Sequence, residues 1–405
     1  MKKGLLLAGA VFSLGIFAES AKAVTIRVNE EQVLKFGFRG IIDAKIRGDR
    51  GKVRVKINGN PKDVPDTSDI VFSHREARIW AKYKLNKIIS FGFQAQLGKA
   101  AEPEIFDSFI NLAFTPEFNI IAGSYKVPFE RHSGLQSGWT IPFPTGPAKG
   151  DFTTKSGEIK HVFANPMNDR LPGSDLRSPG LTLWGNIADG MFKYYVGIFD
   201  GSDELNNAGA SKTGLAIRVQ FTPTMLGYKP EKGYVLKNTY VGKKDVLTVG
   251  VSYALQPYRS GGNPNVDDQT SWGIDLMWEQ KFGTLVPNFQ IGYVNHSNWR
   301  GTKDDDRFGW LVQGQLLYDQ KVFLGKPAIV AKYVRSECDG TGCKDSAGNK
   351  PKLTTWGIGV NYYIKGPTNR ISLAIDNVKI DDINKADLIG DDSYTDVTLS
   401  IFYSF

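Results

Sequence analysis

Apolar and polar positions alternate over the last residues of the chain. In residues 395–405, TDVTLSIFYSF, every second side chain from Val397 to Phe405 is apolar or aromatic, and most of those between are polar. A period of two residues is typical of a β-strand with one apolar and one polar face. The segment therefore predicts a strand that separates two different surroundings.

The same alternation recurs along the chain. Single-chain bacterial outer-membrane barrels have an even number of antiparallel strands, joined by short periplasmic turns and longer extracellular loops. Here, too, short turns such as ADG at 188–190 alternate with longer segments rich in Gly, Asp, Asn and Pro. The pattern predicts sixteen strands, at residues 33–47, 70–85, 87–98, 105–115, 118–127, 179–188, 191–200, 212–222, 244–256, 270–281, 284–295, 307–318, 326–336, 352–364, 369–380 and 393–405.

The first of these strands has one apolar and one charged face. Phe36 and Phe38 lie on the apolar face, and Lys35 and Arg39 on the charged one. In a soluble sandwich the apolar face would be core, whereas in a membrane barrel it meets lipid and the charged face lines the lumen. Aromatic placement favours the barrel, because strands that run toward the short turns end in outward aromatics, which form a girdle at the headgroup level. These are Tyr83, Phe114, Phe221, Tyr318, Tyr362, Tyr403 and Phe405.

The start of the chain has the features of a secretory signal peptide. Lys2 and Lys3 precede a short apolar stretch, and AKA at 21–23 provides a small-residue cleavage site. We expect residues 1–23 to be removed, which leaves one domain, residues 24–405. Aromatic residues make up 12% of the chain, and no later apolar run is long enough to predict a transmembrane helix. The predicted fold is all-β: a 16-stranded antiparallel transmembrane β-barrel in the bacterial outer membrane, with short periplasmic turns and long extracellular loops.

The lumen is the predicted working surface, because sixteen strands enclose an aqueous channel rather than a packed interior. Inward-facing cations outnumber inward acids and gather on the first two strands. Lys and Arg side chains that line a pore select for anions. The alternative is a lumen of mixed charges without marked selectivity. The candidate anion-pathway residues are Lys35, Arg39, Lys45, Arg47, Arg78, Lys82, Lys126, Arg131 and Arg218.

Two connections are unusually long. Residues 128–178 contain Phe129, Trp139 and further aromatics, so their composition does not predict disorder. We expect this loop to fold into the lumen and to set its constriction; the alternative is an extracellular lid packed on neighbouring loops. Residues 223–243 are also long but fall on the side of the short turns, and the sequence offers no physical reason for their length.

Other chemistry is weakly represented. Cys338 and Cys343 lie in a Gly- and Asp-rich loop of an exported chain and are expected to form a disulfide. None of the four histidines has metal-ligand spacing, and no nucleophile elbow is present, so we expect no metal, no cofactor and no enzymatic activity. The formal charge of +8 is spread without a long basic block, which argues against a nucleic-acid partner.

Several segments carry a resemblance to a known family. The heptapeptide GSYKVPF, Gly123–Phe129, resembles the G-x-[FY]-K-x-P-F segment of the phosphate-selective porin O and P family. Similarity extends to LKFGFRGIIDAKI at 34–46, LTLWGNIADGMFKYYVGIFDGSD at 181–203 and GVSYALQ at 250–256. The resemblance implies sixteen-stranded barrels that associate as trimers, with inward-folded loops and a cationic lumen. It also implies passage of anions, with phosphate or polyphosphate preferred in some members.

Taken together, these observations predict an outer-membrane porin for passive diffusion of small hydrophilic solutes, with anions preferred and phosphate-type anions among them. Its expected partners are those solutes, outer-membrane lipid and lipopolysaccharide, and further copies of itself in a homotrimer. Two alternatives stay open. One is a surface-structural or adhesive barrel closed by its loops. The other is a channel for uncharged solutes, in which Trp139 and Trp184 would supply apolar contacts.

Overall fold

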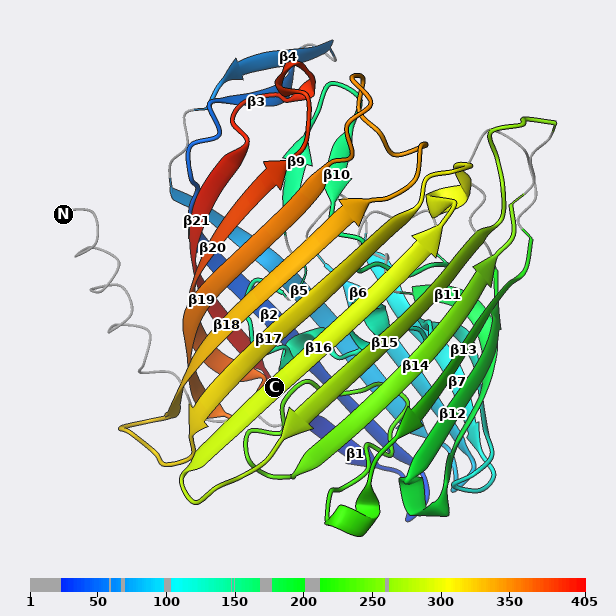
Figure 1. Ribbon diagram of the computed structural model, residues 1–405. Coiled ribbons are helices and arrows are strands. Elements are labelled where there is room, and N and C mark those ends of the chain that lie inside the picture. Colours follow the sequence, from blue (N-terminus) through cyan, green and yellow to red (C-terminus); the bar gives the residue numbers. More distant parts are fainter. Residues whose placement is uncertain are drawn as a thin grey trace.

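The computed structural model describes residues 23–57, 60–66, 70–97, 103–146, 148, 150–167, 177–200, 212–258 and 262–405. All but the last residue of the predicted signal peptide lies outside these ranges. The chain forms a closed barrel of sixteen antiparallel strands (Figure 1). The wall consists of β2 (Val33–Ile46), β5 (Ile70–Lys84), β6 (Ile89–Gln96), β7 (Glu104–Ala113), β8 (Asn119–Lys126), β11 (Arg177–Ile187), β12 (Phe192–Phe199), β13 (Gly214–Phe221), β14 (Val246–Gln256), β15 (Gln269–Glu279), β16 (Leu285–Ser297), β17 (Arg307–Tyr318), β18 (Lys326–Cys338), β19 (Lys352–Lys365), β20 (Asn369–Asp381) and β21 (Ser393–Ser404).

The wall strands agree with the sixteen predicted ones to within a few residues at each end, so the predicted fold class is confirmed. Smaller elements lie in the connections. They are the strands β1 (Val24–Arg27), β3 (Lys52–Ile57), β4 (Asn60–Pro65), β9 (Asp151–Thr153) and β10 (Glu158–Lys160), and the single helical turns η2 (Arg131–Leu135), η3 (Gly138–Thr140), η4 (Ala188–Gly190), η5 (Thr224–Leu226), η6 (Trp299–Gly301) and η7 (Lys385–Asp387). Within the described residues, no helix has both the length and the apolar character needed to span a membrane.

The barrel closes where the first and last wall strands meet. β2 pairs with β5 on one side and with β21 on the other, with Ile42 opposite Ile401. The ladder continues to the last residue, because the backbone N–H groups of Phe38 and Phe405 each donate to the carbonyl of the other. The rings of Phe38 and Phe405 stack with their centroids 5.6 Å apart. The alternating C-terminal segment is therefore the strand that seals the barrel.

Alternation along each strand separates an apolar outer surface from an inner one. On β13, Arg218 is fully buried, whereas its neighbour Val219 is 51% exposed on the outside. Part of the interior is packed rather than open, contrary to the expectation of an aqueous lumen throughout. Aromatic residues that point inward from β8, β11 and β12, such as Tyr125 and Tyr195, form one apolar cluster with Leu236 and other residues of the connections. This core occupies space that sixteen strands would otherwise leave to water.

Candidate functional site

The first part of the long connection after β8 lies inside the barrel, where Figure 1 shows it behind β15 and β16. We refer to residues 128–146 as the loop segment. The backbone N–H of Arg131 donates to Asp275 Oδ2 on β15 at 3.1 Å, and His132 Nε2 lies 3.2 Å from Gln290 Oε1 on β16. Farther along, Thr145 Oγ1 donates to Asp376 Oδ2 on β20 at 2.7 Å. The loop segment therefore reaches inward-facing side chains on the far wall.

Glycine makes this close approach feasible on β16. An added Cβ at Gly292 would lie 2.6 Å from His132 Nδ1 and 2.7 Å from Glu130 Oε1. Both distances are below those that real Cβ atoms adopt, so any other residue at position 292 would push the loop segment away from the wall. Glu130 in turn caps η2, since its Oε2 accepts from the backbone N–H of Ser133 at 2.8 Å.

The return half of the same connection is also held by the wall. His161 bridges two strands: Nδ1 lies 2.9 Å from Ser336 Oγ on β18, and Nε2 lies 2.9 Å from Thr355 Oγ1 on β19. Burial and the nearby charge of Lys332 lower the pKa of His161 to about 3. This imidazole is therefore neutral at physiological pH, and it has a structural role as a hydrogen-bonding bridge.

The connection between β13 and β14, which the sequence left unexplained, folds into the barrel as well. We refer to residues 222–245 as the turn segment. The hydroxyl of Tyr234 donates to the carbonyl of Lys126 at 2.9 Å, and Asn288 Nδ2 on β16 donates to the carbonyl of Asn238 at 2.7 Å. β8 and β13 run in opposite directions in the wall, so the loop and turn segments enter the barrel from opposite ends. The length of the turn segment is explained by this inward path.

The two segments meet and pair by backbone hydrogen bonds. Gln136 forms a parallel bridge with Leu236. The backbone N–H of Ser137 donates to the carbonyl of Leu236 at 2.8 Å, and the N–H of Leu236 donates to that of Leu135 at 3.2 Å. Both leucines are fully buried. Inside the barrel, the loop and turn segments therefore form a short backbone pairing with each other, although they are about a hundred residues apart in the chain.

Two of the nine predicted pathway residues belong to a buried charge cluster. Arg131 and Arg218 are both 0% exposed. Arg131 pairs with Glu231 and Asp275, and Arg218 Nη2 donates to Asp275 Oδ1 at 2.9 Å. Burial alone would lower the pKa of Arg131, but Glu231 and Asp275 raise it above its ordinary value. The positive charges of the two arginines are balanced by the negative charges of Glu231 and Asp275. These ion pairs hold the turn and loop segments against the wall.

Open space borders the inner side of β2, β5 and their neighbours. A cavity of about 330 Å³, which we call the cationic cavity, borders Trp80 and Trp139 and has the acidic side chains Glu76 and Asp107 in its lining. The guanidinium group of Arg39 lies over both tryptophan rings, at 5.4 Å and 5.6 Å from their centroids. Six cations line this cavity: Arg39, Arg78, Lys82, Lys126, Arg177 and Lys237.

Ion pairs neutralise part of that charge. Arg78 Nη2 lies 3.0 Å from Glu76 Oε1, and Arg177 Nε lies 2.9 Å from Asp107 Oδ1. Lys126 is nearly buried and donates from Nζ to the carbonyl of Gly134 at 2.6 Å. Six cations against two acids leave the cationic cavity with an excess of positive charge.

A second cavity continues toward the end of the barrel that carries the short turns. It measures about 740 Å³ and shares Lys82, Asp107, Phe109, Lys126 and Val235 with the cationic cavity. Its lining also includes Lys35, Lys84 and Lys87. The shared residues show that the two cavities adjoin. We refer to the two adjoining cavities together as the passage; cationic side chains outnumber acidic ones in its lining.

The predicted pathway residues thus fall into three groups. Five of them line the two cavities: Lys35, Arg39, Arg78, Lys82 and Lys126. Arg131 and Arg218 lie in the buried charge cluster. The other two lie near the loop end of β2 and line neither cavity: Lys45 is ion-paired with Asp396, and Arg47 is half-buried just after the strand.

Sequence reasoning missed two cations of the cationic cavity. Arg177 is the first residue of β11. The sequence analysis placed this residue at the end of the loop 128–178. Extending the strand by two residues would have included it. Lys237 lies in the turn segment, where no strand period indicated an inward path. The structure also joins Cys338, the last residue of β18, to Cys343 in the loop that follows by a disulfide.

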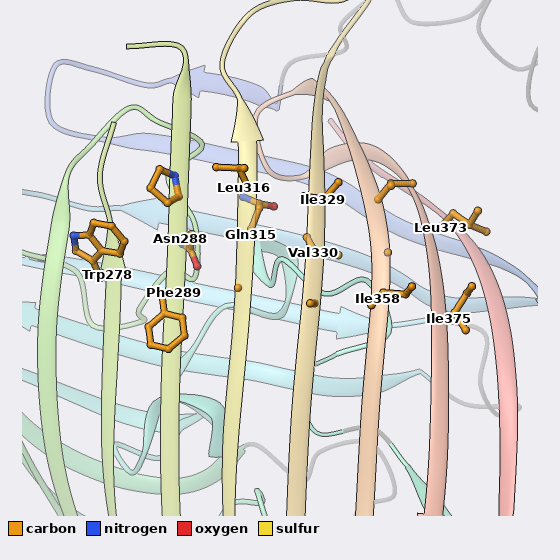
Figure 2. A pocket seen from close by; sticks show the side chains of 15 residues that line it. Trp278, Asn288, Phe289, Gln315, Leu316, Ile329, Val330, Ile358, Leu373 and Ile375 are labelled. Atoms are coloured by element: carbon orange, nitrogen blue, oxygen red, sulfur yellow. The ribbon is translucent and has the colours of Figure 1, made fainter. Parts of the chain in front are cut away.

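Another hollow lies on the outside of the barrel. Figure 2 shows this shallow groove of about 830 Å³ over β15 to β20, lined by apolar side chains such as Leu316, Ile329 and Ile358. Ile329 is 61% exposed, whereas Asn288 and Gln315 in the same part of the wall are buried on the inner side. The groove is part of the apolar outer wall, since most of its lining side chains are aliphatic or aromatic.

Comparisons with known proteins agree on the architecture. No family model matches the chain. An uncharacterized protein of Aquifex aeolicus (strain VF5) is 23% identical in an alignment that covers 90% of this chain and 92% of that protein.

Three solved outer-membrane proteins are similar in structure and cover nearly the whole chain. OprB of Pseudomonas putida has a TM-score of 0.59 at 11% identity, and covers 92% of this chain and 94% of its own. The outer membrane channel DcaP of Acinetobacter baumannii has a TM-score of 0.56 at 13% identity, with coverages of 94% and 99%. OmpF of Salmonella typhi has a TM-score of 0.50 at 11% identity, with coverages of 94% and 100%. With its apolar outer wall and sixteen antiparallel strands, the protein is a barrel of the outer-membrane porin fold.

Proposed function

We propose that this protein is an outer-membrane porin through which small hydrophilic solutes diffuse passively, and that it prefers anions. The observation that carries the proposal is the lining of the cationic cavity, with six cations and two acids. Cationic side chains around a narrow opening lower the electrostatic cost of an anion that gives up part of its hydration shell. Several weak sites in series, from Arg39 to Lys82 and Lys35, would let the anion leave again.

The finer assignments rest on the sequence resemblance. Phosphate-type anions and association as a homotrimer are properties that the phosphate-selective porin O and P family implies. The cationic cavity supports the first of these, because guanidinium groups such as those of Arg39 and Arg78 match the geometry of an oxyanion. Lipid and lipopolysaccharide are the proposed neighbours of the outer wall, whose exposed side chains are mainly apolar and aromatic.

The reversal potential of purified protein in a planar bilayer under a KCl gradient tests this function. We expect an anion-selective sign, and we expect added phosphate to reduce the chloride current. Anion selectivity without reduction by phosphate would support a general anion porin and would contradict the phosphate assignment. Conductance without selectivity would contradict the anion preference.

The packed interior favours one other function, a surface-structural barrel. Leu135 and Leu236 pair at the centre of a buried apolar cluster, which leaves less open space than sixteen strands would enclose. A barrel closed in this way would show no conductance in the same bilayer experiment. That result, with protein that is demonstrably folded, would replace the porin function with the structural one.

A further inference from the structure

The turn segment has one buried side and one open side where it crosses the interior. Tyr234, Leu236 and Asn238 are buried, whereas Val235 is 41% exposed and Lys237 is also exposed. This is the alternation of an extended strand with two faces. The buried side packs on the loop segment and on β16, and the open side faces the cationic cavity, which both Val235 and Lys237 line.

The backbone at Lys237 is held from two directions by the buried ion pair. Its N–H donates to Glu231 Oε1 at 3.2 Å, and its carbonyl accepts from Arg131 Nη1 at 2.7 Å. The next residue, Asn238, donates from its backbone N–H to Thr140 Oγ1 at 3.0 Å. The backbone of Lys237 is thus well anchored, and its ammonium group lies 5.5 Å from the centroid of the Tyr240 ring.

Lys237 adds its positive charge to the same cavity that the cations of the wall strands line. Arg39, Lys82 and Lys126 border the same cavity from β2, β5 and β8, and Lys237 borders it from the turn segment. The passage is therefore bounded on one side by barrel wall, and on the other by Trp139 of the loop segment and by the turn segment, which enters from the end with the short turns. An ion that follows this passage has to move between the two.

We propose that the turn segment forms one wall of the permeation path and that Lys237 is a determinant of its anion preference. This inference rests on the proposed porin function. It adds a selectivity-determining residue that belongs neither to the barrel wall nor to the loop segment. The ion it acts on is a small hydrated anion such as chloride or phosphate, since the contribution is a single ammonium group that borders the cationic cavity.

The first test is Lys237→Glu, measured by reversal potential in a KCl gradient. We expect the ratio of chloride to potassium permeability to fall by about tenfold to a hundredfold. Reversing a unit charge about 6 Å from the permeating ion in a water-like medium disfavours chloride about tenfold and favours potassium by a similar factor. Lys237→Arg should keep the wild-type ratio. The matched control is Lys232→Glu, the same charge reversal on the same segment but outside the lining of both cavities; we expect a change below about twofold.

A second test excludes misfolding of the variant as the cause of a changed selectivity. The two native cysteines are bonded to each other, so Lys237→Cys would introduce the reactive thiol. A negatively charged methanethiosulfonate reagent, added during a recording, should reduce the anion preference of a channel that was conducting a moment earlier. The same reagent on Lys232→Cys should leave the reversal potential unchanged.

The outcomes separate this inference from the function on which it rests. Wild-type channels without anion preference would overturn the proposed function and this inference with it. Wild-type channels that prefer anions, and that keep this preference in Lys237→Glu and after modification of Lys237→Cys, would overturn the role of Lys237 alone. In that case the barrel wall would account for selectivity.

Discussion

Arg131 and Glu231 form an ion pair inside the barrel, with Nη2 of the arginine 2.5 Å from Oε2 of the glutamate. Arg131 belongs to the loop segment and Glu231 to the turn segment, which enter the barrel from opposite ends. Both side chains are almost completely buried. A buried charge is costly unless it is paired and hydrogen-bonded, so each segment supplies the counter-charge that the other needs in order to fold inward.

Breaking this pair should destabilise the protein. In Glu231→Gln the shape is retained, but Arg131 keeps only the shared carboxylate of Asp275. We expect the free energy of unfolding to fall by about 3 kcal/mol, the typical effect of removing one partner from a buried pair. Urea unfolding of protein refolded in lipid or detergent measures it. Glu158→Gln is the control, because its pair with Lys160 is solvent-exposed and should change stability by less than about 1 kcal/mol; equal effects in the two variants would contradict the prediction.

The same pair predicts how stability depends on pH. Burial would raise the pKa of Glu231, but the charge of Arg131 and its hydrogen bond hold that pKa below the ordinary value of 4.5. The folded state therefore keeps the carboxylate ionised at a pH where the unfolded chain already takes up a proton. This contribution is complete above about pH 4.5 and is lost as the pH falls toward the folded pKa. Urea midpoints should drop more steeply below pH 4.5 in wild type than in Glu231→Gln; parallel curves would exclude Glu231 as the cause.

Wall cations of the two cavities should control selectivity. Neutralising Lys35, Arg39 and Lys126 together, each to Gln, should shift the reversal potential toward cations. We expect the permeability ratio to change roughly tenfold or more, from three lost charges in a water-like medium. The control pair is Lys45→Gln with Arg47→Gln, two inward cations that line neither cavity. Unchanged selectivity in the triple variant would remove those residues from the permeation path.

Reduction of the disulfide should affect stability but leave permeation unchanged. Cys338 and Cys343 enclose a very short loop, for which chain entropy gives a stabilisation of about 2 kcal/mol. They lie at the end of β18 and in the loop that follows it, outside the lining of the two cavities. Dithiothreitol should therefore lower the unfolding midpoint while the reversal potential stays constant. A changed reversal potential would mean that this loop contributes to the path.

The local alternation of apolar and polar residues was sufficient to predict the strands of the barrel wall. The predicted strand 244–256 is observed as Val246–Gln256, and the other fifteen agree similarly well. Each strand has one apolar and one polar side, and that pattern is determined by neighbours two residues apart. For the same reason, parity within the strands was enough to identify Arg39, Arg78 and Lys82 as inward-facing.

The roles of the inward residues could not be obtained in this way. Parity places Arg218 inward, but it does not reveal that Asp275 on β15 and Arg131 of the loop segment will bury it. Residues 223–243 have no strand period, because their fold is stabilised by contacts with the loop segment and with β16 rather than by a repeating lateral ladder. Lys237 was therefore missed, although it lines the cationic cavity.

By itself, the sequence determined the class, the number of strands and the side of the wall on which each charge lies, because these depend on alternation within short segments. Only the tertiary structure decided which charges face open space and which neutralise one another. That division depends on where two connections, from opposite ends of the barrel, meet near Gln136 and Leu236. Such contacts join residues about a hundred positions apart, and their free energy comes from burial and charge pairing that no local pattern records.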